Sequence, residues 1–119
     1  MKRTALPKRI TREELIWLAG WLEGEGCFCK DSTGRLSVSG TSTDYDTIVR
    51  VSRLLQCHIT TSNPADEKHK RKWTAQLTGD RARVWMLRLL PLMMSRRQER
   101  IKECLLAEPT KVLLLVSEV

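Results

Sequence analysis

A chain of 119 residues is about the length of one domain and can bury a hydrophobic core of its own. Its 41% hydrophobic residues exclude a disordered or low-complexity chain, and its longest apolar run, residues 112–116, is far too short for a membrane helix. The 21 basic residues outnumber the 14 acidic ones, and the net charge of +7 favours a polyanionic partner, although a merely soluble basic surface stays open.

The first predicted helix begins at Thr11, where Thr11 and Glu14 form a capping box. Apolar and small residues cover nearly the whole surface of residues 12–24, which predicts a helix that is buried on more than one side. We expect Gly24 and Gly26 to close this helix, because glycine accepts the left-handed conformation of a helix end.

Two hairpins, each followed by a helix, are predicted after it. Strands at 27–30 and 35–39 flank a polar turn, and Thr43 is expected to cap a helix over 44–55. The order then repeats with strands at 57–61 and 73–77, a helix that begins at 79–80 and ends before Pro91, and a helix over 95–106 that opens with a capping box, Ser95 to Gln98.

These elements predict an α+β fold in which helices cover one face of an antiparallel sheet and leave the other face free. No linker is visible, so we expect one domain over 1–119, with its core at about 11–106 and a C-terminal tail at 107–119. The free face would carry five polar side chains, with four basic residues at its rim. These are Arg35, Ser37, Ser39, Thr74 and Gln76 on the face, and Lys68, Lys70, Arg71 and Lys72 at the rim.

The four cysteines are expected to be reduced, because no apolar stretch follows the basic residues near the start and we expect no secretory signal. Cys27 and Cys29 are separated by one residue, and Cys57 directly precedes His58. Neither spacing matches the paired ligands of zinc sites, so small buried hydrophobic side chains are the better interpretation.

The candidate functional residues lie at the end of the first helix. Gly20 and Gly24 leave a notch that allows two backbones to approach closely. Glu23 and Glu25 follow at the negative end of the helix, where acidic groups are disfavoured unless a cation lies between them. Hard oxygen ligands on a basic protein indicate Mg²⁺ shared with a phosphate. On spacing alone, a glycine-capped core helix with two solvated glutamates stays equally open.

Residues 18–26, Leu-Ala-Gly-Trp-Leu-Glu-Gly-Glu-Gly, resemble the LAGLIDADG motif of homing endonucleases, with glutamate in place of both aspartates. The similarity covers about residues 11–106, and the chain looks like the small single-motif type found in phages, bacteria and organelle introns. The resemblance implies an αββαββα fold and a homodimer whose motif helices pack together. It also implies hydrolysis of both strands of a long pseudo-palindromic DNA site with Mg²⁺, in the cytoplasm of a phage or bacterial host or in an organelle.

The resemblance also assigns roles to single residues. Glu25 takes the position of the metal-binding catalytic acid, and Arg96 that of a basic residue that is usually lysine. Arginine does not lose its proton, so Arg96 would act only electrostatically. Thr41, or Ser39 in the other register, takes the position of a polar active-site residue. The expected dimer interface is Leu18, Gly20, Trp21, Glu23 and Gly24, with Glu23 satisfying the partner's helix end.

In the same comparison, the polar residues of the free sheet face would read bases in the major groove, and the basic rim would hold phosphates. Two competing functions remain at this stage. One is a non-cleaving nucleic-acid-binding relative, such as an RNA maturase or a DNA-binding regulator. The other is a structural or partner-binding domain that uses the glycine-faced helix.

Overall fold

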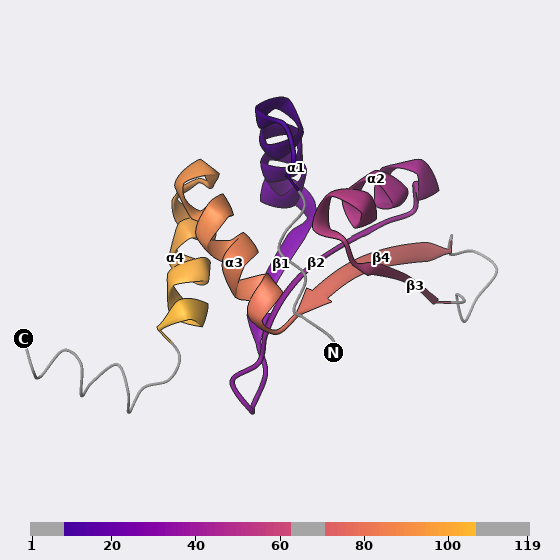
Figure 1. Cartoon of the computed structure of the whole chain (residues 1–119). Helices are drawn as coiled ribbons and strands as arrows, with labels where there is room; N and C mark the ends of the chain where they lie inside the picture. Colours follow the sequence, from indigo (N-terminus) through magenta and orange to yellow (C-terminus); the bar gives the residue numbers. More distant parts are fainter. Residues whose placement is uncertain (1–8, 63–70, 107–119) are drawn as a thin grey trace, which may run out of the picture.

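The computed structural model describes residues 9–62 and 71–106, and in this part of the chain helices cover one face of a four-stranded antiparallel sheet (Figure 1). The elements in chain order are α1 (Arg12–Glu25), β1 (Gly26–Lys30), β2 (Leu36–Ser42), α2 (Tyr45–Leu55), β3 (His58–Ser62), β4 (Lys72–Thr78), α3 (Asp80–Leu89), the 3-10 turn η1 (Leu90–Leu92) and α4 (Ser95–Leu105). The predicted α+β fold is confirmed. The predictions for Lys68, Lys70 and the tail at 107–119 lie outside the described residues.

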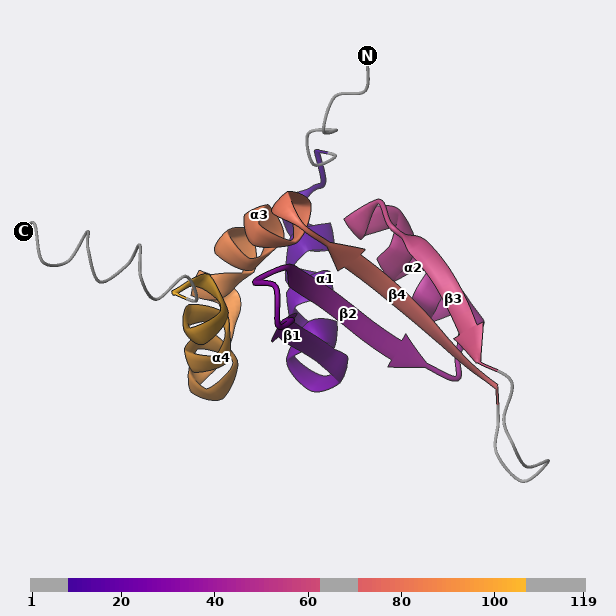
Figure 2. The same cartoon turned by 90° about the horizontal axis from the view of Figure 1, so that it is seen from below.

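The sheet order is β1-β2-β4-β3, so the inner strands of the two hairpins pair with each other in the middle of the sheet. Seen from below, the strands lie in front of α1 and α2, α3 lies beside the end of β4, and this face of the sheet is bare (Figure 2). Strict alternation explains the two faces, because Leu36, Val38 and Gly40 are buried whereas the residues between them are not.

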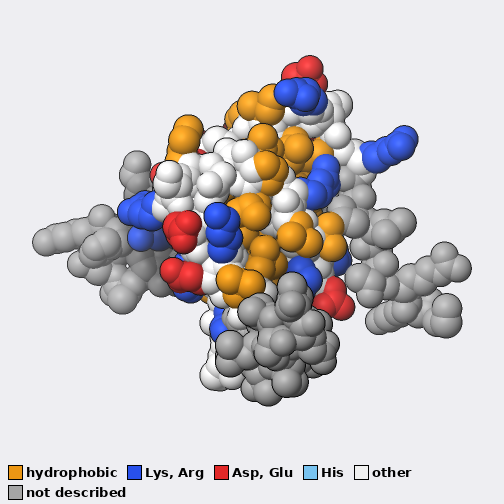
Figure 3. Space-filling view, turned by 90° about the vertical axis from the view of Figure 1, so that its left-hand side faces the viewer, with side chains coloured by type: hydrophobic (Ala, Val, Ile, Leu, Met, Phe, Trp, Pro, Cys, Tyr) orange, Lys and Arg blue, Asp and Glu red, His pale blue; other side chains and the backbone are white. Residues whose placement is uncertain are grey.

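The core lies between the sheet and the helices. The largest fully buried side chains are Trp85 of α3 and Phe28 of β1, and Leu18 and Leu22 of α1 are buried beside them. No described helix is long and apolar enough to cross a membrane. The side of the molecule with α3 and α4 has hydrophobic side chains at its surface (Figure 3), which distinguishes it from the polar sheet face. Leu87 of α3 and Met94, just before α4, are among the exposed hydrophobic residues.

The first helix ends at Gly26, its C-cap, as predicted, but the predicted role of Gly24 and the predicted left-handed conformation are wrong. α1 continues through Gly24 to Glu25, and Gly26 has an extended backbone with φ −79° and ψ 157°. Gly26 is needed for space, since a Cβ there would lie 2.5 Å from the carbonyl oxygen of Leu22. The chain therefore passes straight from α1 into β1, and Glu25 stands at the junction.

Two predicted caps are also wrong. Asp44, not Thr43, is the N-cap of α2, and its own N–H donates to Ser42 Oγ at 2.9 Å. Met94, not Ser95, is the N-cap of α4, and its N–H donates to Glu23 Oε1 at 2.6 Å. The carboxylate that accepts the Met94 N–H thus belongs to Glu23 of α1, far away in the sequence. This hydrogen bond takes the place of the expected capping box within α4.

Candidate functional site

The bare face of the sheet is a continuous polar surface. Ser39 of β2 lies opposite Gln76 of β4, and Thr41 lies opposite Thr74, whose hydroxyl oxygen is 2.8 Å from that of Thr41. Arg35 reaches the same face, where its Nη2 donates to Thr78 Oγ1 at 3.2 Å. The structure therefore brings together the side chains that alternation predicted for base recognition, which are Arg35, Ser37, Ser39, Thr74 and Gln76.

The outer strand β3 extends this polar surface, which the sequence analysis missed. His58 lies opposite Gln76 and Thr60 lies opposite Thr74, so both share the bare face. Both are exposed, whereas Ile59 between them packs against the core. The polar–apolar–polar alternation of residues 58–60 was the available signal.

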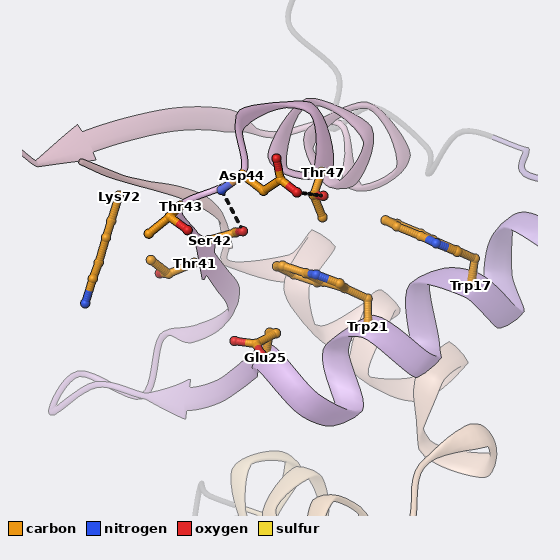
Figure 4. A pocket seen from close by; sticks show the side chains of 9 residues that line it. All are labelled: Trp17, Trp21, Glu25, Thr41, Ser42, Thr43, Asp44, Thr47 and Lys72. Carbon is orange, nitrogen blue, oxygen red and sulfur yellow. Dashed lines mark hydrogen bonds between the residues drawn. The ribbon is translucent and has the colours of Figure 1, made fainter. Parts of the chain in front are cut away.

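A pocket of about 600 Å³ lies where α1 ends beside the sheet, and Glu25, Thr41 and Lys72 line it (Figure 4). Glu25 directly precedes Gly26, and Gly26 pairs with Gly40. Because β1 and β2 are antiparallel, Glu25 therefore lies beside Thr41. The structure thus brings together the predicted catalytic acid and the predicted hydroxyl, and Thr41 rather than Ser39 lines this pocket. Lys72 of the basic rim adds a positive charge, while Arg71 is exposed next to it.

Tryptophan side chains form one wall of this pocket. The Trp21 ring lies against Gly40, where any Cβ would overlap it, and the Arg50 guanidinium stacks over Trp17 at 4.1 Å from the ring centre. Asp44 is a second carboxylate in the lining, which the sequence analysis missed. It accepts a 3.5 Å hydrogen bond from Thr47 Oγ1, so it is engaged with its own helix (Figure 4).

Arg96 does not line the Glu25 pocket. It is exposed at the start of α4 and lines a separate pocket with Cys27, Arg97 and Arg100. A catalytic role for Arg96 stays a prediction, and within one chain the described cation in the Glu25 pocket is Lys72.

The cysteine beside Arg96 departs from the sequence expectation. Cys27 is exposed rather than buried, because it points to the bare face of the sheet. Its Sγ lies 3.1 Å from that of Cys29, and this contact raises the pKa of Cys27, with partial burial adding to the effect. Cys104 is the buried one, and desolvation raises the pKa of its thiol.

Only part of the predicted dimer interface lies on an open surface. Gly20 and Gly24 are open, since a Cβ at either position would meet nothing within 4 Å. Leu18 is fully buried in the chain's own core, and Trp21 packs on the chain's own sheet. Ile16, one turn before Gly20, is 52% exposed, and the sequence analysis did not include it in the interface. Its spacing of four residues from Gly20 was the available signal, because residues four apart lie on the same helix face.

Glu23 acts within its own chain, contrary to the expectation that it satisfies a partner's helix. Its side chain accepts the Met94 N–H, and its backbone carbonyl accepts a 3.1 Å hydrogen bond from Arg97 Nε. Glu23 therefore connects α1 to the start of α4. Glu25, two residues later, makes no hydrogen bond to a described residue and is free for a ligand.

The oxygen donors around Glu25 fit a magnesium ion. Mg²⁺ is held in proteins by one or two carboxylates together with substrate phosphates and water, and Glu25 with Thr41 offers such hard oxygens. No three His, Cys, Asp or Glu side chains within residues 9–62 and 71–106 gather closely enough to hold a metal on their own. One chain would therefore share the ion with a phosphate or with a second carboxylate.

Comparison with known proteins identifies the fold. No family model and no curated protein matches the chain. Two solved structures of the homing endonuclease I-CvuI match it with a TM-score of 0.53 and 18% sequence identity. One holds the I-CreI target with Mg and uncleaved DNA, and the match covers 86% of this chain and 74% of that one. The other holds I-CvuI's own target with Ca, and the match covers 85% and 73%. The chain thus has the homing-endonuclease fold, as the motif resemblance implied.

Proposed function

We propose that the protein is a site-specific DNA endonuclease that works as a homodimer and cuts both strands with Mg²⁺. The observation that carries the proposal is the position of Glu25. This exposed carboxylate stands where the bare polar sheet face meets the open, glycine-notched face of α1. A nuclease needs its acidic group at that junction, because DNA would lie on the sheet and the second active site would come from the partner across the notch.

The sheet face suits double-stranded DNA. Hydroxyl and amide groups on it can donate and accept hydrogen bonds at base edges in the major groove, which admits a two-stranded β-ribbon. The net charge of +7 supplies attraction to phosphates that does not depend on sequence. The I-CvuI structures, which hold DNA, support this assignment.

The open face of α1 suits a second copy of the chain. Gly20 and Gly24 leave no side chain between two helices, and the exposed Ile16 beside them supplies apolar area. A two-fold axis through this face would bring the Glu25 carboxylates of both copies close together, with one active site for each DNA strand.

In the proposed reaction, the Glu25 carboxylate oxygens would hold the metal beside the scissile phosphate. When bound, Mg²⁺ supplies a Lewis acid and lowers the pKa of water at neutral pH. The Thr41 hydroxyl lines the same pocket and can donate a hydrogen bond to a phosphate oxygen or orient a water molecule. Lys72 offsets the negative charge that develops on the phosphate.

The test compares the wild-type chain with Glu25→Gln on DNA that rejoins the two flanks of its own coding region. We expect the wild type to cut this DNA with Mg²⁺, and the variant to bind it with similar affinity without cutting. Cleavage by the variant at the wild-type rate would refute the role of Glu25.

One observation favours a second function, a nucleic-acid-binding relative that has lost cleavage. Arg96, the expected catalytic cation, lies outside the Glu25 pocket. If this function is correct, the wild type binds DNA or RNA with a steep salt dependence but leaves it intact with Mg²⁺. The cleavage assay above separates the two functions.

A further inference from the structure

A second basic pocket lies at the other end of the bare sheet face. It encloses about 410 Å³ where β4 passes into α3, and its lining includes Arg35, Thr78, Gly79, Asp80, Arg81 and Arg83. Three guanidinium groups and one carboxylate leave it clearly positive. None of the three arginines forms an ion pair with another described residue.

Two of the three arginines, Arg35 and Arg81, are held in place by neutral hydrogen-bond partners, so they keep their full charge. Arg35 Nη2 donates to Thr78 Oγ1 at 3.2 Å. Arg81 Nη2 donates to the carbonyl oxygens of Leu55 at 2.9 Å and Gln56 at 2.7 Å, at the C-terminus of α2. Fixed cations lose little side-chain entropy when they bind an anion, which favours binding.

The start of α3 adds backbone donors to this pocket. Gly79 is the N-cap and offers no side chain to the free N–H groups of the first turn. Its φ of +84° favours glycine here, and the Arg35 guanidinium lies 3.6 Å from where a Cβ would stand. Free amides at a helix N-terminus combined with three arginines form a binding site for a phosphate group.

We propose that this pocket, which we call the distal clamp, binds one backbone phosphate of the DNA far from the cut. The proposal rests on the proposed function. Arg35 in the distal clamp directly precedes β2 and lies six residues before Thr41 in the Glu25 pocket, which is about 20 Å at 3.3 Å per extended residue. Successive phosphates of one strand are about 3.4 Å apart along the helix axis, so the clamped phosphate lies about six nucleotides from the scissile one.

The first experiment measures DNA affinity and its salt dependence without divalent metal, so that no cleavage occurs. We expect Arg83→Ala to weaken binding about tenfold and to reduce the salt slope by about one. Arg53→Ala is the matched control, because it removes the same charge from an exposed position on α2, outside this pocket. Arg35→Gln is a second variant that should lose the same amount of DNA affinity. Thermal unfolding of both variants is the check that they are folded.

The second experiment replaces phosphates five to seven nucleotides from the cut with uncharged methylphosphonates. We expect the wild type to lose about tenfold in affinity and Arg83→Ala to lose almost nothing more, because the two changes remove the same contact. The distal clamp is refuted, while the proposed function stands, if Arg83→Ala has the same DNA affinity and salt slope as Arg53→Ala. It is also refuted if the methylphosphonates reduce the affinity of Arg83→Ala as much as that of the wild type. If the wild type binds no DNA, both are refuted.

Discussion

The two acids at the end of α1 should differ sharply in their effect on stability. Glu23 Oε1 accepts the N–H of Met94, the N-cap of α4, whereas Glu25 is exposed and makes no hydrogen bond to a described residue. We therefore expect Glu23→Ala to destabilise the fold and Glu25→Ala to leave it nearly unchanged, although the two residues are only two positions apart.

The structure gives the size of the effect. A hydrogen bond to a charged group contributes about 1.5–3 kcal/mol, and loss of a helix cap costs about 0.5–2 kcal/mol. The Glu23 side chain is 30% exposed and its Oε2 lies 3.9 Å from Arg97 Nε, so solvent screens this ion pair and we add nothing for it. Removing a negative charge from a helix C-terminus returns a few tenths of a kcal/mol. The expected loss for Glu23→Ala is about 2 kcal/mol, with Glu23→Gln between it and the wild type.

Urea unfolding at several protein concentrations measures this difference. With a slope of about 2 kcal/mol per molar urea, the midpoint of Glu23→Ala should fall by about 1 M, and that of Glu25→Ala by less than about 0.3 M. Because donor and acceptor belong to one chain, the loss should not depend on protein concentration. A loss that grows on dilution would show that Glu23 acts across an interface, and equal midpoints for both variants would refute the link between α1 and α4.

Three further predictions concern the glycines and the β1–β2 turn. Gly20→Ala should weaken self-association at least tenfold, as measured by sedimentation, because the added methyl group fills the notch between the two helices. The same substitution should raise the stability of the separated chain by up to about 1 kcal/mol, because alanine has the higher helix propensity. Unchanged association would contradict the proposed interface. Gly40→Ala should cost about 1–3 kcal/mol in urea unfolding, because its Cβ would overlap the Trp21 ring; a neutral result would show that Trp21 does not pack there. The Thr33 hydroxyl lowers the pKa of Asp31, so this group stabilises the fold above about pH 4 and its contribution is lost as pH falls through the lower folded pKa. The melting temperature of the wild type should exceed that of Asp31→Asn at pH 6 and approach it near pH 3, and a difference that stays constant with pH would contradict this assignment.

Local patterns predicted most of the fold and the main parts of the site. Alternation in β2 and β4 gave the two faces of the sheet, and the motif at the end of α1 identified Glu25, because both signals depend only on neighbours in sequence. The role of Glu23 could not be predicted, since its partner Met94 is 71 residues away. The same limit explains why Trp21 was assigned to an interface, because the space that it fills exists only through Gly40 on another element.

The distal clamp also lies beyond the reach of sequence patterns. Arg35 directly precedes β2 and Arg83 belongs to α3, and only the pairing of β2 with β4 brings the start of one strand beside the end of the other. Sequence reasoning placed Arg35 among the base-reading residues and gave Arg83 no role. The fixed geometry of the pocket is what indicates a phosphate.

The most direct test of the central claim uses mixed dimers of wild-type and Glu25→Gln chains, purified with different tags, on a supercoiled plasmid that carries the target. If each copy contributes one Glu25 carboxylate to the cutting of one strand, mixed dimers should nick the plasmid and give open circles with Mg²⁺. Linear plasmid formed by mixed dimers at the wild-type rate would contradict the claim that each strand depends on its own Glu25. Intact plasmid after treatment with the wild-type dimer itself would contradict the claim that the protein is a nuclease.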